Sequence, residues 1–550
     1  MQGLLAILAL CGAAAANQDA ASRAGDLYRE QRWVDVVSLW RGQQDPAAEL
    51  NFYAAMSLAR LNQRPEARAV LEAGQRKSPG DKRFPLELGG LDFAEHNLAS
   101  ARTHLRRALY LDPGDPYAND LLASIYFVSG NLEAALRYWN RVDKPRIDEI
   151  RMAPVPKADP VLVDAAFFAP ASTLRLRELW ATQANLELLG IFSRYQFALT
   201  PRASDEGFDL VFHSAERNGW GSTPTEGLAS LLRGVAYETL YPEFYNLGRR
   251  AVNVTSLIRL DPNKLRVFAK LGAPVGGPQH RFEAFLDARR ENWDLTRSFH
   301  GAGRTPTDLR LDKIEGGVAI RSVVNEQWQW TTGVSVSDRA FARLRNADAA
   351  FTGGLMVRCR ARVDHPLLRL PEHRLTVQSS ATGEMGKLLA QGYGSFERLS
   401  GAVDAHWLPQ AQGDKYELAA GVRAGRTFGP VPLDELIVLG LERDNDLALG
   451  AHIGTHHGKK GSAPLGRNYF LVNAEADRAV FQNAFLKIGM GPFLDSGKNT
   501  DPSGPFGEPK WLSDAGARLK LRILGRVGIA FSYGKDLRSG RNAFYLTALN

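Results

Sequence analysis

Two spacings of apolar residues follow one another along the chain. Up to about residue 145 the apolar positions have a helical spacing, and from about residue 250 they alternate one by one with polar or charged positions. A period of about 3.6 residues predicts amphipathic helices, whereas a period of about two predicts strands that are apolar on one face. The sequence therefore predicts a helical part that is followed by a large β part.

The helical part, 20–145, contains a repeat of 34 residues. Three alanines and two copies of a turn keep this interval: Ala67, Ala101 and Ala135, with Pro79-Gly80-Asp81 and Pro113-Gly114-Asp115. The period is similar to that of the tetratricopeptide repeat (TPR), in which small residues lie where two helices approach closely. We expect an all-α solenoid with the three alanines in its core. Such a solenoid either binds a protein partner or serves as a spacer.

Charged and aliphatic residues alternate in the β part. The clearest examples are 264–271, 355–363 and 518–523. A soluble sandwich would bury the apolar face of such strands, whereas a membrane barrel would turn it to lipid. Many of the segments are about ten residues long, which suffices for a tilted strand to cross a bilayer, and this favours an antiparallel transmembrane β-barrel of about 16 strands. The arginines expected to face its lumen are Arg266, Arg358, Arg360 and Arg522.

The N-terminus and the composition suit an exported protein. Residues 1–16 are apolar and end in small residues, which predicts a signal peptide, although no Lys or Arg precedes the apolar run. An ordinary apolar helix is the alternative. Beyond this segment only Cys359 remains, which excludes an intramolecular disulfide and a zinc site of several cysteines. No later segment has about 18 consecutive apolar residues, so membrane crossing would depend on strands. The formal net charge of +8 is not clustered, so nucleic acid is not expected as a partner.

Four motifs in the β part point to a known family. They are DELIVLGLERDNDL at 434–447, GKKGSAPLGRNYF at 458–470, GPFLDSG at 491–497 and SYGKDLR at 532–538. From about residue 145 to the C-terminus the chain resembles the BamA/TamA outer-membrane barrel superfamily, also called the bacterial surface antigen family. In that family the first motif lies in a long loop that folds into the barrel, and the third matches the pattern Phe-x-Asp-x-Gly. The resemblance implies that an edge near the first and last strands templates an incoming strand by hydrogen bonds.

The resemblance also implies a tip for the inward loop. The family has an Arg-Gly-aromatic sequence there, and the aligned residues of this chain are Gly450, Ala451 and His452. The arginine is absent, so the tip would lose a charged hydrogen bond to an acid of the inner wall. Strand parity makes Asp495 the candidate acid. The alternative is that the loop is external and solvated.

Two arginines near this tip are candidates to replace the missing one. We expect Arg443 or Arg467 to be the cation nearest Asp495 or another acid of the lumen, since a plugged interior leaves little water for an unpaired charge. The chain also ends at Asn550, without the terminal aromatic residue of many outer-membrane barrels. Altered insertion activity is therefore expected, with the fold unchanged.

The segment 146–219, between the two parts, resembles a polypeptide-transport-associated (POTRA) module. A helical stretch from Leu174 to Phe192 precedes two short strands, 195–199 and 208–212, with a turn at 205–207. Because a helix followed by a hairpin is a common unit, a linker that packs on the repeat domain is the alternative.

Signals of catalysis are weak. His452, His456 and His457 lack the glutamate of a helical metalloprotease motif and lie among glycines, which indicates a loop and not a zinc site. Gly458-Lys459-Lys460 lacks the rest of a phosphate-binding loop, and no Gly-x-Ser-x-Gly sequence occurs. We therefore expect no enzyme activity, no metal and no cofactor.

The expected architecture is multidomain: a signal peptide at 1–16, TPR-like repeats at 20–145, a POTRA-like module at 146–219 and an outer-membrane β-barrel at 220–550. The expected function is insertion, assembly or translocation of protein or lipid at the bacterial outer membrane. The barrel would contact lipid, and the repeats and the module would lie in the periplasm and receive protein partners or cargo. A passive pore or structural envelope protein is the main alternative, and a soluble repeat scaffold with a β-sandwich is a more distant one.

Overall fold

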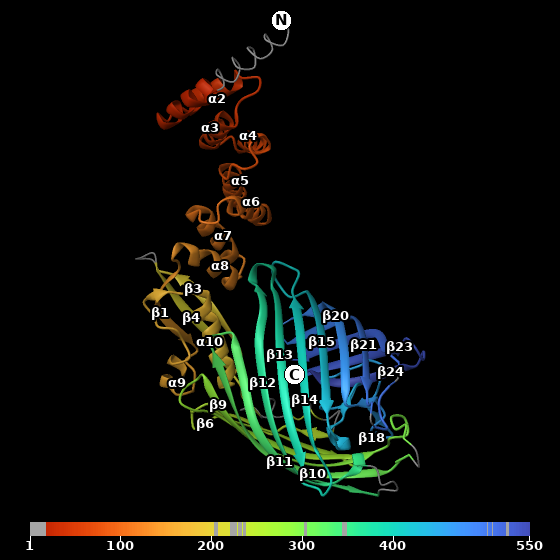
Figure 1. Ribbon diagram of the computed structural model, residues 1–550. Helices are drawn as coiled ribbons and strands as arrows, with labels where there is room; N and C mark the ends of the chain where they lie inside the picture. Colours follow the sequence, from red (N-terminus) through yellow and green to blue (C-terminus); the bar gives the residue numbers. More distant parts are fainter. Residues whose placement is uncertain are drawn as a thin grey trace. The chain divides into compact units, whose positions relative to one another are not determined.

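The computed structural model describes residues 18–202, 207–219, 228, 231, 234, 238–301, 305–343, 349–483, 485–502, 504–508, 510–523 and 527–549. These residues form two compact units, one made of the chain up to residue 146 with 173–176, the other of 147–172 with 177–550. Figure 1 shows the chain coloured along its sequence. The expected signal peptide, 1–16, lies outside the described residues.

The first unit is helical. It comprises a helix at 18–29, α2 (Trp33–Arg41), α3 (Ala48–Arg60), α4 (Arg64–Lys77), α5 (Arg83–Ala94), α6 (Leu98–Leu111), α7 (Pro116–Val128), α8 (Leu132–Trp139) and the 3-10 turn η1 (Asn140–Val142). Helices that are consecutive in the sequence pack against one another. The 34-residue interval is visible in the contacts, because Ala67, Ala101 and Ala135 are all fully buried. Two asparagines at the same interval, Asn97 and Asn131, cap the N-termini of α6 and α8 with their side chains.

A small α/β region begins the second unit. Its elements are β1 (Arg146–Ala153), α9 (Pro160–Asp164), β2 (Ser172–Thr173), α10 (Leu176–Leu189), β3 (Phe192–Pro201) and β4 (Phe208–Glu216). The sheet order is β2-β1-β4-β3, with β1 parallel to β4 and the β3–β4 pair antiparallel. The expected helix and hairpin are present, and Phe192, Phe197 and Phe212 pack edge to face or tilted in the core of this region. None of the described helices of the chain is long and apolar enough to span a lipid bilayer.

The rest of the second unit is a curled antiparallel sheet (Figure 1). Its strands are β5 (Thr239–Leu240), β6 (Glu243–Leu247), β7 (Val252–Asp261), β8 (Lys264–Pro274), β9 (His280–Trp293), β10 (Leu309–Val324), β11 (Trp328–Ala342), β12 (Gly354–Leu370), β13 (Leu375–Leu388), β14 (Ser395–Trp407), β15 (Tyr416–Phe428), β20 (Asn468–Gln482), β21 (Leu486–Thr500), β22 (Leu512–Ile523), β23 (Val527–Asp536) and β24 (Asn542–Leu549). The remaining short elements are the 3-10 turns η2 (Ala349–Phe351) and η3 (Pro371–His373). Each strand from β7 to β15 and from β20 to β24 is paired in register with the next, and β15 pairs with β20 across a long loop.

The outer face of this sheet is apolar and its inner face is charged, which is the reverse of the arrangement in a soluble β-protein. Outward aliphatic side chains are widely exposed, for example Val267 at 54%, Leu399 at 63% and Leu494 at 53%. Their neighbours on the other face are charged and include the buried Asp495 and Arg339. Exposed aliphatic side chains on one strand after another would be unfavourable in water and are what a lipid-facing wall requires. The alternation predicted from the sequence is therefore confirmed, with Arg266, Arg358, Arg360 and Arg522 on the charged face.

The expected closure and strand count need correction. The strand order has the form of a barrel with 18 segments, four of which (β5, β6 and two in the long loop) have two to five residues, so the count of 16 is not confirmed. Within the described residues no backbone register joins β24 to β5 or β6, although that order makes β24 and β5 neighbours. Both β5 and β6 pair with β7 instead, as two short pieces of one edge. The predicted hydrogen-bonded closure is therefore not present in the part of the chain that is described.

Candidate functional site

The long loop between β15 and β20, residues 429–467, lies against the charged inner face of the sheet. It contains the 3-10 turn η4 (Leu433–Glu435) and the short strands β16 (Ile437–Val438), β17 (Thr455–His456), β18 (Lys459–Lys460) and β19 (Leu465–Gly466). Its two ends are joined to each other, because β16 pairs with β19. Leucines of the loop, such as Leu433 and Leu465, are buried with Phe299, Phe351 and Phe506 from other inter-strand connections. The loop is thus part of the interior, as the resemblance implies.

The first attachment of the loop is a buried cluster of charges at η4. Glu435 accepts hydrogen bonds from Lys313 (2.8 Å), Arg339 (3.3 Å) and Arg358 (3.1 Å), which come from three adjacent strands. Asp434 pairs with Arg339 and with Lys313, each at 3.0 Å. The side chains of Lys313 and Arg339 are 3% and 0% exposed, so the two loop acids neutralise wall cations that have almost no access to water.

A second cluster lies further along the loop. Glu442 pairs with Lys264 at 2.7 Å, and their side chains are only 5% and 4% exposed. Asp444 pairs with Arg259 at 2.8 Å and with Arg266 at 2.7 Å. In these two clusters the loop supplies the anions and the wall supplies the cations.

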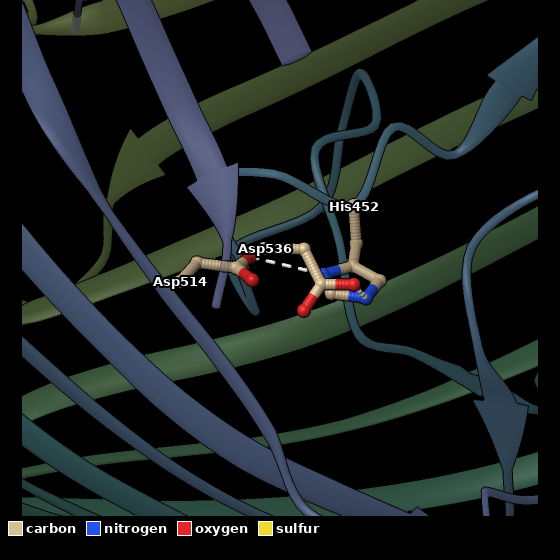
Figure 2. Close-up of side chains that lie close together, drawn as sticks. All are labelled: His452, Asp514 and Asp536. Carbon is tan, nitrogen blue, oxygen red and sulfur yellow. Dashed lines mark hydrogen bonds and ion pairs between the residues drawn. The ribbon is translucent and has the colours of Figure 1, made fainter. Parts of the chain in front are cut away.

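At the tip of the loop the signs are reversed. The backbone amide of Gly450 donates to Asp495 Oδ2 at 3.0 Å, and the amide of Ala451 donates to Asp514 Oδ2 at 2.7 Å. His452 Nδ1 lies 2.9 Å from the same Asp514 oxygen, and its Nε2 lies 3.9 Å from Asp536 Oδ2 (Figure 2). The wall therefore offers three aspartates, which the loop meets with two backbone donors and an imidazole instead of a guanidinium.

The tip is fitted closely to the wall. A Cβ atom on Gly450 would lie 2.1 Å from Phe493 Cε2 and 2.3 Å from its Cζ. The Phe493 ring is itself held, since the Arg518 guanidinium lies 4.4 Å from the ring centroid and a Cβ on Gly516 would lie 2.7 Å from the ring. Gly450 is thus required by close approach of the backbone, because any side chain would overlap a ring that has little room to move.

The expectation that Arg443 or Arg467 is the cation nearest Asp495 is wrong, whereas its alternative, another acid of the inner face, agrees with the contacts of both arginines. Arg443 pairs with Asp261 at 3.5 Å, and Arg467 pairs with Asp501 at 2.9 Å. The cation paired with Asp495 is Arg518, at 3.6 Å on the neighbouring strand. The direction of Asp495 is correct, since it is 1% exposed and faces the loop tip. The positions of the two loop arginines depend on the path of the loop, which strand parity does not give.

Several residues of this site were missed from the sequence. Asp514 and Asp536 lie directly opposite each other on β22 and β23, and Asp514 is also opposite Asp495 on β21. Parity alone would have put Asp514 on the inner face, because it is an even number of residues from Arg518. The other histidines have different contacts: His456 pairs with Asp294 at 3.5 Å, whereas His457 is exposed.

No protein-family model and no curated protein matches this chain. Solved structures that are similar to it include the following three. CdiB from Escherichia coli is 14% identical with a TM-score of 0.49, and the match covers 74% of this chain and 75% of that one. BamA from Haemophilus ducreyi lacking POTRA domains 1–3 is 10% identical with a TM-score of 0.43, covering 74% and 84%. CdiB from Acinetobacter baumannii is 12% identical with a TM-score of 0.43, covering 80% of each chain.

Proposed function

We propose that this chain is an outer-membrane barrel protein of the BamA/TamA superfamily that inserts polypeptides into the outer membrane or passes them across it, without enzymatic chemistry. The observation that carries the proposal is the inverted polarity of the sheet together with the inward loop. An apolar outer face fits lipid, and the inner face is occupied by a loop that is held by two charge clusters and by the hydrogen bonds at its tip.

The attached loop disfavours the passive pore. An open channel needs a water-filled lumen. Here acidic residues of the loop form ion pairs with cations of the wall such as Lys313 and Lys264. Opening such a lumen would leave buried charges without partners, at a cost of about 3–5 kcal/mol for each broken pair. A structural envelope protein stays the second candidate, since it also needs a closed interior.

The edge between β24 and the short strands β5 and β6 is the proposed binding surface for an incoming polypeptide strand. Backbone groups on an unpaired strand edge can hydrogen-bond to an incoming strand, which provides affinity without sequence specificity. Phe544 on β24 is 64% exposed on the apolar face, so a client strand that pairs there would have its own apolar side chains in lipid.

The α/β region is proposed to act as a POTRA-like module that binds the incoming polypeptides and transfers them to this edge. Its helix α10 ends against the barrel: Arg281 on β9 donates to the carbonyl oxygens of Leu188 and Leu189 at 3.1 and 2.8 Å. A cation at a helix C-terminus satisfies carbonyl groups that have no partner within the helix. The TPR-like helices are proposed to bind periplasmic protein partners.

Site-specific photo-crosslinking tests the proposal. A photoreactive residue at Phe544 is compared with one at Leu399 on β14, which is 63% exposed on the same apolar face but lies in the middle of the sheet. We expect outer-membrane or secreted polypeptides to crosslink at position 544 and not at 399. Equal crosslinking at both positions, or an unchanged set of outer-membrane proteins after depletion of this chain, would contradict the proposed function.

A further inference from the structure

We propose that His452, Asp514 and Asp536 form a binding site for a divalent transition-metal cation, for which zinc is the best match. One possible ligand atom of each residue lies within 4.8 Å of those of the other two. The three side chains come from the loop, from β22 and from β23, and they converge on one point (Figure 2). One imidazole nitrogen with two carboxylate oxygens is a donor set that zinc accepts, with water at the remaining position.

The strongest support is an oxygen of Asp514 that has no partner. The Asp514 side chain is 0% exposed, and its Oδ2 accepts from Ala451 and faces His452, while Oδ1 makes no hydrogen bond with any residue that the structure describes. A fully buried carboxylate oxygen without a donor is unfavourable. A bound cation at this point would supply the missing charge and the missing contact together.

The charges around the site also favour a bound cation. Asp495, Asp514 and Asp536 lie opposite one another on three adjacent strands. The cation paired with Asp495 is Arg518, which also forms a 2.7 Å ion pair with Glu475. Among the described residues, neither Asp514 nor Asp536 forms an ion pair with a lysine or an arginine, so the site carries excess negative charge.

The orientation of His452 suits a metal ligand. Nδ1 lies 2.9 Å from Asp514 Oδ2 and Nε2 lies 3.9 Å from Asp536 Oδ2, so each ring nitrogen faces one of the two carboxylates and either can be the ligand when the other carries the proton. The alternative is a protonated imidazole that bridges Asp514 and Asp536 as an ion pair, which would leave Asp514 Oδ1 without a partner.

A metal here would join the loop tip to two strands of the wall. The ordinary contacts of the tip are two backbone hydrogen bonds and one imidazole contact, which are weaker than the carboxylate clusters at η4 and at Glu442. The inference does not depend on the proposed function, because a metal clasp would stabilise the loop in a transporter and in a structural protein alike.

Metal binding by the purified full-length chain tests the inference. The chain, in detergent and without a polyhistidine tag, carries serine in place of Cys11 and Cys359, so that no thiol binds metal. It is stripped with a chelator and titrated with Zn²⁺, and in parallel with Co²⁺, whose visible spectrum reports its ligands. We expect one equivalent to bind, and we expect His452→Ala and Asp536→Asn each to weaken binding by at least about tenfold.

The matched control is His457→Ala, which removes an exposed histidine of the same loop and should leave binding unchanged. Heat-modifiable migration in gels shows that each variant has a folded barrel, and Asp536→Asn keeps the volume of the side chain in case His452→Ala does not fold. A parent chain that binds no Zn²⁺ at micromolar concentration would overturn the inference. So would binding that falls as much in His457→Ala as in Asp536→Asn.

Discussion

The backbone amide of Gly450 lies 3.0 Å from Asp495 Oδ2, at the position where the resembled family has an arginine. An uncharged donor on the main chain thus replaces a charged donor on a side chain. The replacement is possible because the absence of a Cβ lets the loop approach the wall to within hydrogen-bonding distance, where Phe493 would exclude a larger residue.

Restoring the family arginine is therefore expected to harm this protein. Gly450→Arg and Gly450→Ala both place a Cβ about 2 Å from the Phe493 ring, and overpacking of this kind costs about 1–3 kcal/mol. The measurement is the denaturant midpoint at which the heat-modifiable band is lost. Gly489→Ala is the control, because a Cβ there would meet only one atom, Arg478 O at 3.8 Å. A Gly450→Arg variant as stable as its parent would show that the tip can move aside.

The cluster at η4 is expected to be the strongest attachment of the loop. Lys313→Met would leave Asp434, Glu435 and Glu315 short of one buried cation, and breaking a buried pair costs about 3–5 kcal/mol. Lys270→Met is the control, since Lys270 also faces inward but is 38% exposed and lies 3.7 Å from its partner Glu283. Its loss should cost less than about 1 kcal/mol. Equal losses in a chemical unfolding titration would mean that the loop contacts contribute little.

Local patterns predicted the faces of the strands but not their partners. Alternation placed Arg266 and Arg358 on the inner face, because the direction of a side chain in a strand depends only on its own position. Arg443 does not pair with Asp495, because its partner among the inner-face acids, Asp261, is 182 residues away in the sequence and is reached only along the path of the loop. A single strand pattern carries no information on such contacts.

The candidate metal site shows the same limit. The histidine spacing within the loop predicts no metal site, because spacing reports only on ligands that lie in one segment. The carboxylates that approach His452 belong to β22 and β23, and they meet only because the register puts Asp514 opposite Asp536. Register is set by the pairing of whole strands, so it is not readable from either segment alone.

The repeat of 34 residues permits a test in the helical unit. Ala101 is fully buried in α6, so Ala101→Leu should overpack the helix crossing and destabilise the unit by about 1–3 kcal/mol. Ala99→Leu is a matched control on the same helix, because Ala99 is exposed. The excised residues 18–146 would be followed by circular dichroism during thermal unfolding. If both variants melt like the parent, the repeat register is wrong.

The same unit is expected to lose stability in acid through Lys82. The hydrogen bond from Lys82 lowers the pKa of Asp112. Burial raises the pKa of Asp115, but the hydrogen bonds from Lys82 and from the Ala118 amide, together with the charge of Lys82, lower it below its usual value. Because the pKa of both aspartates is lower in the folded state than in the unfolded state, their ion pairs with Lys82 stabilise the unit above the unfolded pKa of about 4. This stabilisation is lost as the pH falls through the pKa values of the folded state. Hydrogen bonds to both aspartates raise the pKa of Lys82 to about 12, so the pair also persists to alkaline pH.

Lys82→Met should therefore lower the melting temperature of the unit at pH 7, with a difference from the parent that shrinks below about pH 4. Arg29→Met is the control, because Arg29 and its partner Asp26 are both more than half exposed. A difference that stays constant from pH 7 to pH 2 would show that lost packing of the lysine stem, and not the ion pair, causes the effect.

Thiol labelling distinguishes an inward loop from an external one. Gly450 is unsuitable for a cysteine because of Phe493, whereas Ala451 already carries a Cβ atom and its amide donates to the buried Asp514. In a Cys359→Ser background, an impermeant maleimide should label Gln391→Cys on intact cells. Gln391 is exposed in the β13–β14 connection, at the same end of the sheet as the Phe299–Phe351–Phe506 cluster.

Ala451→Cys should stay unlabelled, because a probe would have to pass that cluster to reach the loop tip. Ala411→Cys, exposed in the β14–β15 connection at the opposite end, should be labelled only after the outer membrane is permeabilised. Together the three sites separate burial from sidedness: a periplasmic position becomes reactive on permeabilisation, whereas a position plugged inside the sheet does not. Rapid labelling of Ala451→Cys on intact cells would mean that the loop is external, and the loop-filled lumen on which the proposed function depends would then not exist in the membrane.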